Sequence, residues 1–286
     1  MQRIFAGILM LPALILLTGL SGCGKEEPPA QPRKPRLTGG AGGGDSGKQA
    51  AKATIKPGSA KVAGRVVLAG EAPKPASLEP KMKEHNDKAT CLAGAEFEKV
   101  EQTWMIGKDN GVANAVVWLS PPDGSDFEMG KASGDAEIDQ PHCVYIPHIV
   151  VVKPGQKLLI KNSANVIHNT NLTVDTLVNV KGFGQAIPAG KTEVVDWLKP
   201  QDSPIVVGCQ FHNWMSAKIW VLPHQYVAVT DKDGNFTIDN APEGTEVSVV
   251  AWHEGASPNY FYGGKKGTKH SFKGGANDLK LEVKAP

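Results

Sequence analysis

Hydrophobic and polar residues alternate over short stretches along most of the chain after residue 57. Alternation with a period of two is typical of a β-strand that is buried on one face. No run of twenty apolar residues and no sustained helical periodicity occurs in this part of the sequence, so we predict an all-β fold. The strands that are predicted most clearly are residues 61–70, 111–120, 143–152, 157–161, 192–198 and 245–252.

The segments between these strands carry weaker signals. Residues 81–95 are polar and are expected to form a short helix or a loop that carries Cys91. An Asp-Gly pair at residues 233–234 predicts a β-hairpin over residues 226–238. Further strands are expected at residues 97–106 and 170–180, with loops at residues 128–139 and 181–185.

Two predicted strands flank a short loop that contains a cysteine, a histidine and a methionine. Ile205, Val207 and Cys209 have the same parity along the first strand, so they should face inward together. Met215 begins a second inward-facing series on the strand that follows the loop. The thiol of Cys209, the imidazole of His212 and the thioether of Met215 can therefore converge at one end of a β-sandwich.

This combination of side chains indicates a copper site. Soft sulfur ligands together with imidazole favour copper, and one Cys with two His and a weak axial Met forms the type 1 copper set. The loop supplies one histidine, so the second must come from elsewhere in the chain. The best donor is His168, which lies far enough upstream of Cys209 for several intervening strands. His148 is the reserve ligand.

The pair His168-Asn169, followed by the Cys-x-x-His-x-x-Met loop, resembles the cupredoxin family of blue copper proteins. The loop is most similar to that of amicyanin and shorter than that of plastocyanin. The resemblance covers roughly residues 136–222 and implies a Greek-key β-sandwich that holds one type 1 copper ion. It implies His168, Cys209 and His212 as equatorial ligands, Met215 as the axial ligand, and Asn169 as a residue that braces the ligand loop.

His212, as a loop residue, is expected to be the more exposed ligand and the point where electrons enter or leave. Asn213 departs from the amicyanin pattern, which has proline at this position, and this puts the loop's stiffness and the solvent access of His212 in doubt. Trp214 is either an electron entry patch, a lid over the copper or a packing residue. His85, His224 and His270 are expected to lie on the surface.

Other interpretations of these residues stay open. Cys209 could be a buried structural cysteine, or a catalytic nucleophile with His212 or His168 as its base. The close spacing of Cys209, His212 and Met215 favours a metal site over a catalytic dyad. His142 and His148 could share one face of a strand and form a second metal site, although two polar strand residues are far commoner.

The segments on either side of the cupredoxin-like region resemble the carboxypeptidase regulatory-like, or transthyretin-like, domain. The resemblance rests on residues 62–66 and 113–119, the Thr-Asp-x-Asp-Gly-x-Phe motif at 230–236, and the Pro-x-Gly turn at 242–244. We expect residues 58–133 and 223–286 to form one split β-sandwich, with the cupredoxin domain, residues 134–222, inserted at a hairpin tip. The rival arrangement is an N-terminal elaboration of the cupredoxin followed by a separate C-terminal module. Contacts between the strands at 113–119 and 245–252 would support the split arrangement.

The amino terminus is typical of an export signal. One positive charge precedes an apolar run that ends near Leu20. The sequence Leu20-Ser-Gly-Cys23 resembles the lipobox of bacterial lipoproteins, which implies removal of residues 1–22 and lipid attachment to Cys23. An ordinary signal peptide with an incidental cysteine is the alternative. Residues 23–57, rich in Gly, Pro, Ala and Lys, are expected to be a disordered linker.

Cysteine usage is compatible with export. Of the four cysteines, Cys91 and Cys143 remain once Cys23 and Cys209 are assigned to lipid and copper. In an oxidising compartment we expect these two to form a disulfide. A Cys143–Cys209 disulfide, which would abolish the copper site, or free buried thiols are the alternatives.

Charge restricts the class of partner. The chain has 286 residues, with 31 Lys and Arg against 29 Asp and Glu, and its positive excess is concentrated before residue 58. A basic tether and a faintly acidic body argue against nucleic acid as a partner.

The resulting hypothesis is a protein exported to the periplasmic or cell-surface side of a bacterial membrane, held there by a lipid anchor, that carries electrons rather than catalysing a reaction. Similarity to amicyanin implies a redox partner such as a c-type cytochrome or a dehydrogenase. The alternative is a non-redox β-sandwich that binds or scaffolds, with a degenerate or copper-storage site.

Overall fold

The computed structural model describes residues 52–256 and 261–286, and the structural statements below concern these residues. The expected signal peptide, the lipidation site Cys23 and the linker up to residue 51 lie outside them. Within the described part, no helix has the length and apolar character needed to cross a membrane. This part of the chain is nearly all β, as predicted from the sequence.

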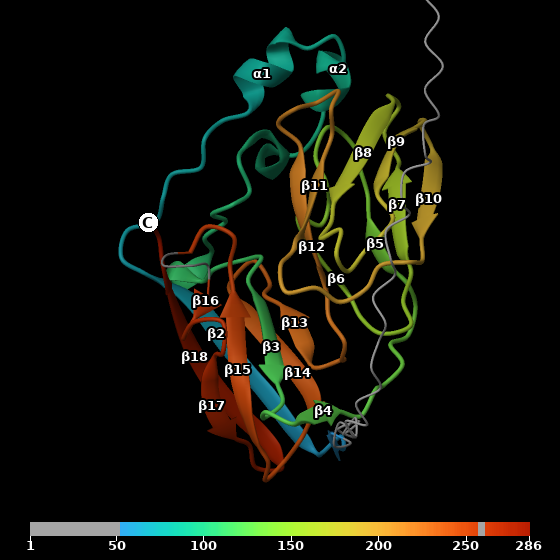
Figure 1. Cartoon of the computed structure of the whole chain (residues 1–286). Helices are drawn as coiled ribbons and strands as arrows, with labels where there is room; N and C mark the ends of the chain where they lie inside the picture. Colours follow the sequence, from blue (N-terminus) through green and yellow to red (C-terminus); the bar gives the residue numbers. More distant parts are fainter. Residues whose placement is uncertain (1–51, 257–260) are drawn as a thin grey trace, which may run out of the picture. The chain divides into compact units, whose positions relative to one another are not determined.

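Two sheets form a β-sandwich from the central part of the chain (Figure 1). Side chains from both sheets meet in one core, which includes Ile160 from one sheet and Val207 and Ile219 from the other. The five-stranded sheet has the order β6 (Ile149–Val152), β12 (Ser216–Val221), β11 (Ile205–Gly208), β8 (His168–Thr173), β9 (Phe183–Ile187). The three-stranded sheet has the order β10 (Lys191–Val195), β7 (Leu158–Asn162), β5 (Ala136–Ile138).

A second pair of sheets encloses a separate core, in which Val62, Leu119 and Val249 are fully buried. The first sheet has the order β13 (Val227–Val229), β3 (Val116–Ser120), β15 (Glu246–Trp252), with β16 (Phe261–Tyr262) and β17 (Thr268–Ser271) both paired to β15. The second has the order β14 (Asn235–Ala241), β2 (Ala60–Ala69), β18 (Gly275–Lys284), and a short parallel pair joins β1 (Ala53–Ile55) to β4 (Ser125–Phe127).

Strands from before and after the central sandwich share these sheets. β3 pairs with β15 in antiparallel register, with Val117 opposite Ala251, and Figure 1 shows the two strands side by side. β2 likewise pairs with both β14 and β18. These are the contacts that a split sandwich requires, whereas the domain boundaries and the transthyretin-like resemblance remain predictions.

A third core joins the two sandwiches. The outer faces of β6 and β12 pack against the outer face of the sheet that contains β3 and β15, through Ile149, Trp220, Val116 and Trp252. The rings of Trp220 and Trp252 lie edge to face at 5.5 Å. β12 is therefore buried on both faces near its end. The side chain of Trp220 lies on the face of β12 opposite the ligand-bearing core, and it is still only 2% exposed.

Several local predictions were wrong. The expected strand at residues 97–106 is instead a short 3₁₀-helix, η1 (Glu96–Lys99), followed by an irregular segment with isolated bridges at Val100 and Ile106. The carboxylate of Glu98 accepts a hydrogen bond from the Ala95 amide. The expected loop at residues 181–185 is largely strand β9, an edge strand whose side chains are mostly exposed. An exposed edge strand has no buried face, so hydrophobic alternation does not reveal it.

The hairpin expected over residues 226–238 is also wrong. β13 pairs with β3 and β14 pairs with β2, so the turn between them connects the two sheets of the sandwich. The carboxylate of Asp231 accepts hydrogen bonds from the amides of Asp233 and Asn235 and fixes this turn. Gly234 has a φ of 82°, and a Cβ at this position would lie 2.3 Å from the Val66 carbonyl oxygen. The Asp-Gly pair thus marks a real turn but not a hairpin.

Two short helices precede the central sandwich, α1 (Glu79–Glu84) and α2 (Lys88–Cys91). They confirm the helix-or-loop prediction for residues 81–95. Met82 of α1 and Cys91 of α2 are buried in the same core as the central sandwich. We call residues 79–91 the cap.

His224 lies in the interior, not on the surface as expected. It is 6% exposed and packs edge to face against Phe127, with ring centroids 5.2 Å apart. Burial lowers the pKa of His224 to about 4 from its ordinary value of 6.5. The imidazole of His224 therefore takes up a proton at a higher pH in the unfolded chain than in the folded protein. Protonation favours the unfolded chain, so the folded protein loses stability as the pH falls below 6.5.

We expect His224→Gln to remove this part of the pH dependence. In urea unfolding of the metal-free protein, the free energy of unfolding should fall by about 2 kcal/mol less between pH 7 and pH 5 than in the wild type. Phe127→Leu is the matched control, because it disturbs the same contact without removing a titrating group and should keep the wild-type pH dependence. Equal pH dependence in the wild type and His224→Gln would contradict the assignment.

Candidate metal centre

The sheet brings the candidate ligands together. β8 and β11 are antiparallel neighbours, so His168 at the start of β8 lies beside Cys209, which directly follows β11. The Cys209 sulfur is 4.0 Å from Nδ1 of His168 and 3.8 Å from Nδ1 of His212. Met215 is 3% exposed and belongs to the same buried cluster as Cys209. Its amide donates a hydrogen bond to the carbonyl of His212, which closes the loop tightly.

Asn169 contacts the loop through its backbone. Its amide N–H donates to the Cys209 sulfur at 3.4 Å. Its side-chain oxygen accepts a hydrogen bond from the side chain of Asn171, so the side chain is held within β8. The contact from Asn169 to Cys209 is thus made by the backbone N–H, and the bracing role of the Asn169 side chain stays a prediction.

Both histidines are poised as neutral imidazoles. Burial lowers the pKa of His168 to about 4, with a further contribution from the neighbouring His212. Burial and the nearby His85 lower the pKa of His212 as well. A neutral imidazole has one nitrogen lone pair free, and this is the form that binds a metal ion. Two such nitrogens, a thiol and a thioether form a donor set that suits copper.

His212 is completely buried, and the prediction that it is the exposed ligand is wrong. The cap covers its ring: the ring of His85 lies 4.4 Å away, and the carboxylate of Asp87 accepts a hydrogen bond from its Nε2 at 3.1 Å. This hydrogen bond fixes the tautomer in which Nδ1 carries the lone pair, facing Cys209. Trp214 packs edge to face against the same ring at 5.4 Å.

The cap is fastened to the sandwich at several points. The structure contains the expected disulfide between Cys91 and Cys143, which leaves Cys209 as a free cysteine. The hydroxyl of Thr90 donates to the side-chain oxygen of Asn165 at 2.6 Å. The Nε2 of His85 donates to the carbonyl of Phe211 at 3.1 Å. The Trp214 indole also donates to the carbonyl of Cys143, so the ligand loop and the disulfide are directly linked.

Sequence reasoning missed His85 and Asp87 as residues of this site. Both precede Cys209 by well over a hundred positions and lie in a polar segment without strand periodicity. The only sequence signal for this contact was Cys91, because its pairing with Cys143 draws the segment to the sandwich.

His148 and His142 are engaged with carboxylates. His148 pairs with Glu254, which also contacts the ammonium of Lys218 at 3.2 Å. Burial would raise the pKa of Glu254, but its hydrogen bond to His148 and the charges of His148 and Lys218 lower it to about 2. Nδ1 of His142 lies 2.8 Å from the carboxylate of Glu98. The two histidines therefore have different partners, and the expected shared face is not used for a common site.

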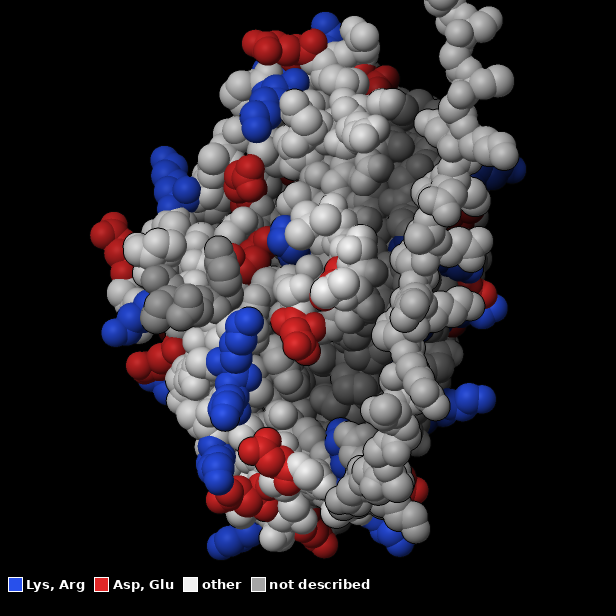
Figure 2. Space-filling view, in the orientation of Figure 1, with Lys and Arg blue, Asp and Glu red and all other residues white. Residues whose placement is uncertain are grey.

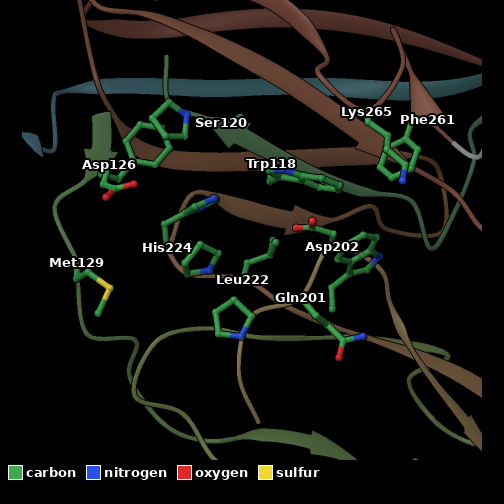
Figure 3. Close-up of a pocket in the computed structure, with 15 residues that line it drawn as sticks. Trp118, Ser120, Asp126, Met129, Gln201, Asp202, Leu222, His224, Phe261 and Lys265 are labelled. Carbon is green, nitrogen blue, oxygen red and sulfur yellow. The ribbon is translucent and has the colours of Figure 1, made fainter. Parts of the chain in front are cut away.

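A cleft of about 660 Å³ is lined by none of the candidate copper ligands His168, Cys209, His212 and Met215 (Figure 3). Figure 3 shows Trp118 in the middle of the cleft, with Phe261 and Lys265 at one end and Asp126 at the other, and His224 along the opposite wall. Aromatic walls with a few polar groups are typical of binding clefts.

The sequence matches no protein-family model and no curated protein. Among solved structures, this chain is similar to amicyanin from Paracoccus versutus, with 17% identity and a TM-score of 0.27, over 32% of this chain and 85% of that chain. It is similar to a purple cupredoxin from Nitrosopumilus maritimus, with 19% identity and a TM-score of 0.25, over 31% of this chain and 100% of that chain.

It is also similar to a copper-containing nitrite reductase from Thermus scotoductus, with 13% identity and a TM-score of 0.27, over 33% of this chain and only 25% of that chain. The similar structures are thus cupredoxins. Similarity at these scores does not show the function of this chain.

Proposed function

We propose that this protein holds one copper ion in a mononuclear type 1 site and carries single electrons rather than catalysing a reaction. The observation that supports the proposal is the convergence of the Cys209 sulfur with Nδ1 of His168 and His212 within 4.0 Å, beside the buried Met215. Cys209, His168 and His212 would hold the ion, with the thioether of Met215 as a fourth and weaker donor. When bound, copper supplies a one-electron redox couple.

The chain's own contribution is to hold these ligands still. His168 and Cys209 are fixed by neighbouring strands, Asn169 donates its N–H to the sulfur, and Asp87 orients the ring of His212. The cap excludes water from His212. Ligands that stay in place in both oxidation states keep the reorganisation on electron transfer small.

In such a site the outer edge of the His212 ring would not be the direct path for electrons to the copper, because that edge faces Asp87 and not the solvent. The loop offers two aromatic residues beside the ligand: Phe211, which is 45% exposed, and the half-buried Trp214. We assign the entry or exit of electrons to this aromatic surface of the loop.

The setting of the protein belongs to the same proposal. Export and lipid anchoring through Cys23 would hold it on the periplasmic or cell-surface side of a bacterial membrane. Its partner would be a redox protein such as a c-type cytochrome or a dehydrogenase. Figure 2 shows Lys and Arg interspersed with Asp and Glu over one face, a distribution that gives no support to nucleic-acid binding.

The decisive experiment is an optical and EPR spectrum of the soluble form that begins at Lys25, after addition of one equivalent of copper(II). A type 1 site predicts an intense thiolate-to-copper charge-transfer band in the visible region and a narrow copper hyperfine splitting. A colourless protein, or the pale spectrum of ordinary copper(II), would refute the proposal.

Met215→Leu tests the axial ligand separately. The variant should keep the visible band but show a higher reduction potential, because a fall from four ligands to three destabilises copper(II) more than copper(I), which accepts low ligand numbers. Direct electrochemistry of wild type and variant measures the shift. Ile219→Leu, a change in the same core on β12, is the control and should leave the potential unchanged. An unchanged potential in Met215→Leu would argue that Met215 is not a ligand.

The aromatic-walled cleft favours a second candidate, a non-redox binding or scaffold lipoprotein with a degenerate or copper-storage site. On that hypothesis, bound copper would exchange freely with solvent and show no reversible electrochemistry. The same electrochemical measurement therefore separates the two candidates.

A further inference from the structure

The disulfide lies directly against the candidate copper ligands. Donor atoms of His85, Cys91 and His212 are all within 4.8 Å of one another, and so are donor atoms of Cys143, His168 and His212. His212 belongs to both groups, so each sulfur atom of the Cys91–Cys143 disulfide lies within 4.8 Å of a ring nitrogen of His212.

The cap has enough other contacts to stay in place without the disulfide. Met82 is completely buried, Asp87 is hydrogen-bonded to His212, and Thr90 to Asn165. Breaking the sulfur–sulfur bond would therefore leave two thiols close together beside imidazoles. Donors that are already held near one another lose little conformational freedom when they bind a metal.

We propose that reduction of the Cys91–Cys143 disulfide creates a copper(I) site formed by the thiolates of Cys91 and Cys143 and the imidazole of His85. The ring would bind through Nδ1, which would give up the hydrogen bond that it now accepts from the Asp87 amide. Soft thiolate ligands select copper(I), and copper(I) accepts two or three ligands. The inference goes beyond electron transfer. It gives the protein a second copper-binding state that is switched on by a dithiol reductant and does not require Cys209.

An external dithiol supplies the electrons and protons that reduce the Cys91–Cys143 disulfide. A dithiol gives up two electrons and two protons and becomes a disulfide, while the Cys91–Cys143 bond breaks to give two thiols. Each thiol that binds copper(I) then releases its proton to solvent. No oxidation or reduction of the copper ion takes place.

The test is an anaerobic titration of the full-length protein with copper(I) in competition with a chromogenic copper(I) chelator. Oxidised protein is compared with protein that has been reduced by dithiothreitol and then freed of it. We expect the reduced protein to bind one more equivalent of copper(I) than the oxidised protein. X-ray absorption should show an additional pair of copper–sulfur contacts.

Three variants identify the ligands of the extra equivalent. Cys209→Ala should keep it, which separates this site from the proposed type 1 site. The double variant Cys91→Ser, Cys143→Ser should lack it under both conditions. His85→Gln should weaken it by about tenfold or more.

Equal copper(I) stoichiometry in reduced and oxidised wild type would overturn the inference, and so would loss of the extra equivalent in Cys209→Ala. Detachment of the cap on reduction would overturn it too; the readout is a change in tryptophan fluorescence that is present in the wild type and absent in Trp214→Phe. These outcomes are distinguishable from a failure of the proposed function, which is judged by the visible band of the oxidised protein with copper(II).

Discussion

Replacing Cys209 with alanine is expected to abolish the intense visible band of the copper(II)-loaded protein. The band arises from charge transfer between a thiolate and copper, and Cys209 is the free thiol that the described structure places between His168 and His212. Loss of a hydrogen-bond partner of a metal ligand typically lowers metal affinity by about 10–100-fold. Loss of the ligand Cys209 itself should lower the copper(II) affinity by more than this. Optical titration in competition with a chelator measures both effects.

Val207→Ala provides the control for this variant. Val207 lies on β11 two residues before Cys209 and is fully buried, so its truncation lowers stability without removing a ligand. It should keep the band at full intensity. Retention of the band in Cys209→Ala would show that the copper binds elsewhere and would remove the basis of the proposed function.

Replacing Asp87 with alanine is expected to have the second largest effect, a loss of copper(II) affinity of about 10–100-fold. The carboxylate of Asp87 accepts a hydrogen bond from Nε2 of His212, and it sets which ring nitrogen faces Cys209. Its removal takes away the acceptor of this buried N–H and frees the ring to turn. Asp87→Asn keeps an acceptor but not the charge, so it should show a smaller loss.

Glu84→Ala is the matched control, because Glu84 lies in the same cap, is exposed, and carries the same charge. It should bind copper like the wild type. An equal loss of affinity in Asp87→Ala and Glu84→Ala would indicate a general effect of charge rather than a specific positioning of His212. An unchanged affinity in Asp87→Ala would show that the cap does not orient the ligand.

Strand parity and ligand chemistry made the centre of the candidate site predictable. The inward parity of Ile205, Val207 and Cys209 follows directly from the period of a strand, and the structure buries Ile205 and Val207 completely. The disulfide was predictable because four cysteines with two assigned roles left one pair. His168 required the resemblance to a known family, since spacing alone does not single it out.

The parts that could not be predicted are those in which distant segments meet. The polar segment that contains His85 and Asp87 has no hydrophobic pattern to indicate that it covers His212. Trp220 and His224 are buried by the packing of two sandwiches, and strand periodicity describes the faces of only one sheet at a time. β9 was missed for the opposite reason, because an exposed edge strand leaves no apolar signature.

The pairing of β3 with β15 has a consequence for the order in which the protein folds. More than a hundred residues separate β3 from β13, and the separation from β15 is larger still. Closing an unstructured loop of about a hundred residues costs on the order of 4 kcal/mol. If the central sandwich folds first, its β6 and β12 already form the apolar surface on which β3, β13 and β15 assemble. We therefore expect the ligand-bearing sandwich to fold first and to act as the template for the sandwich around it.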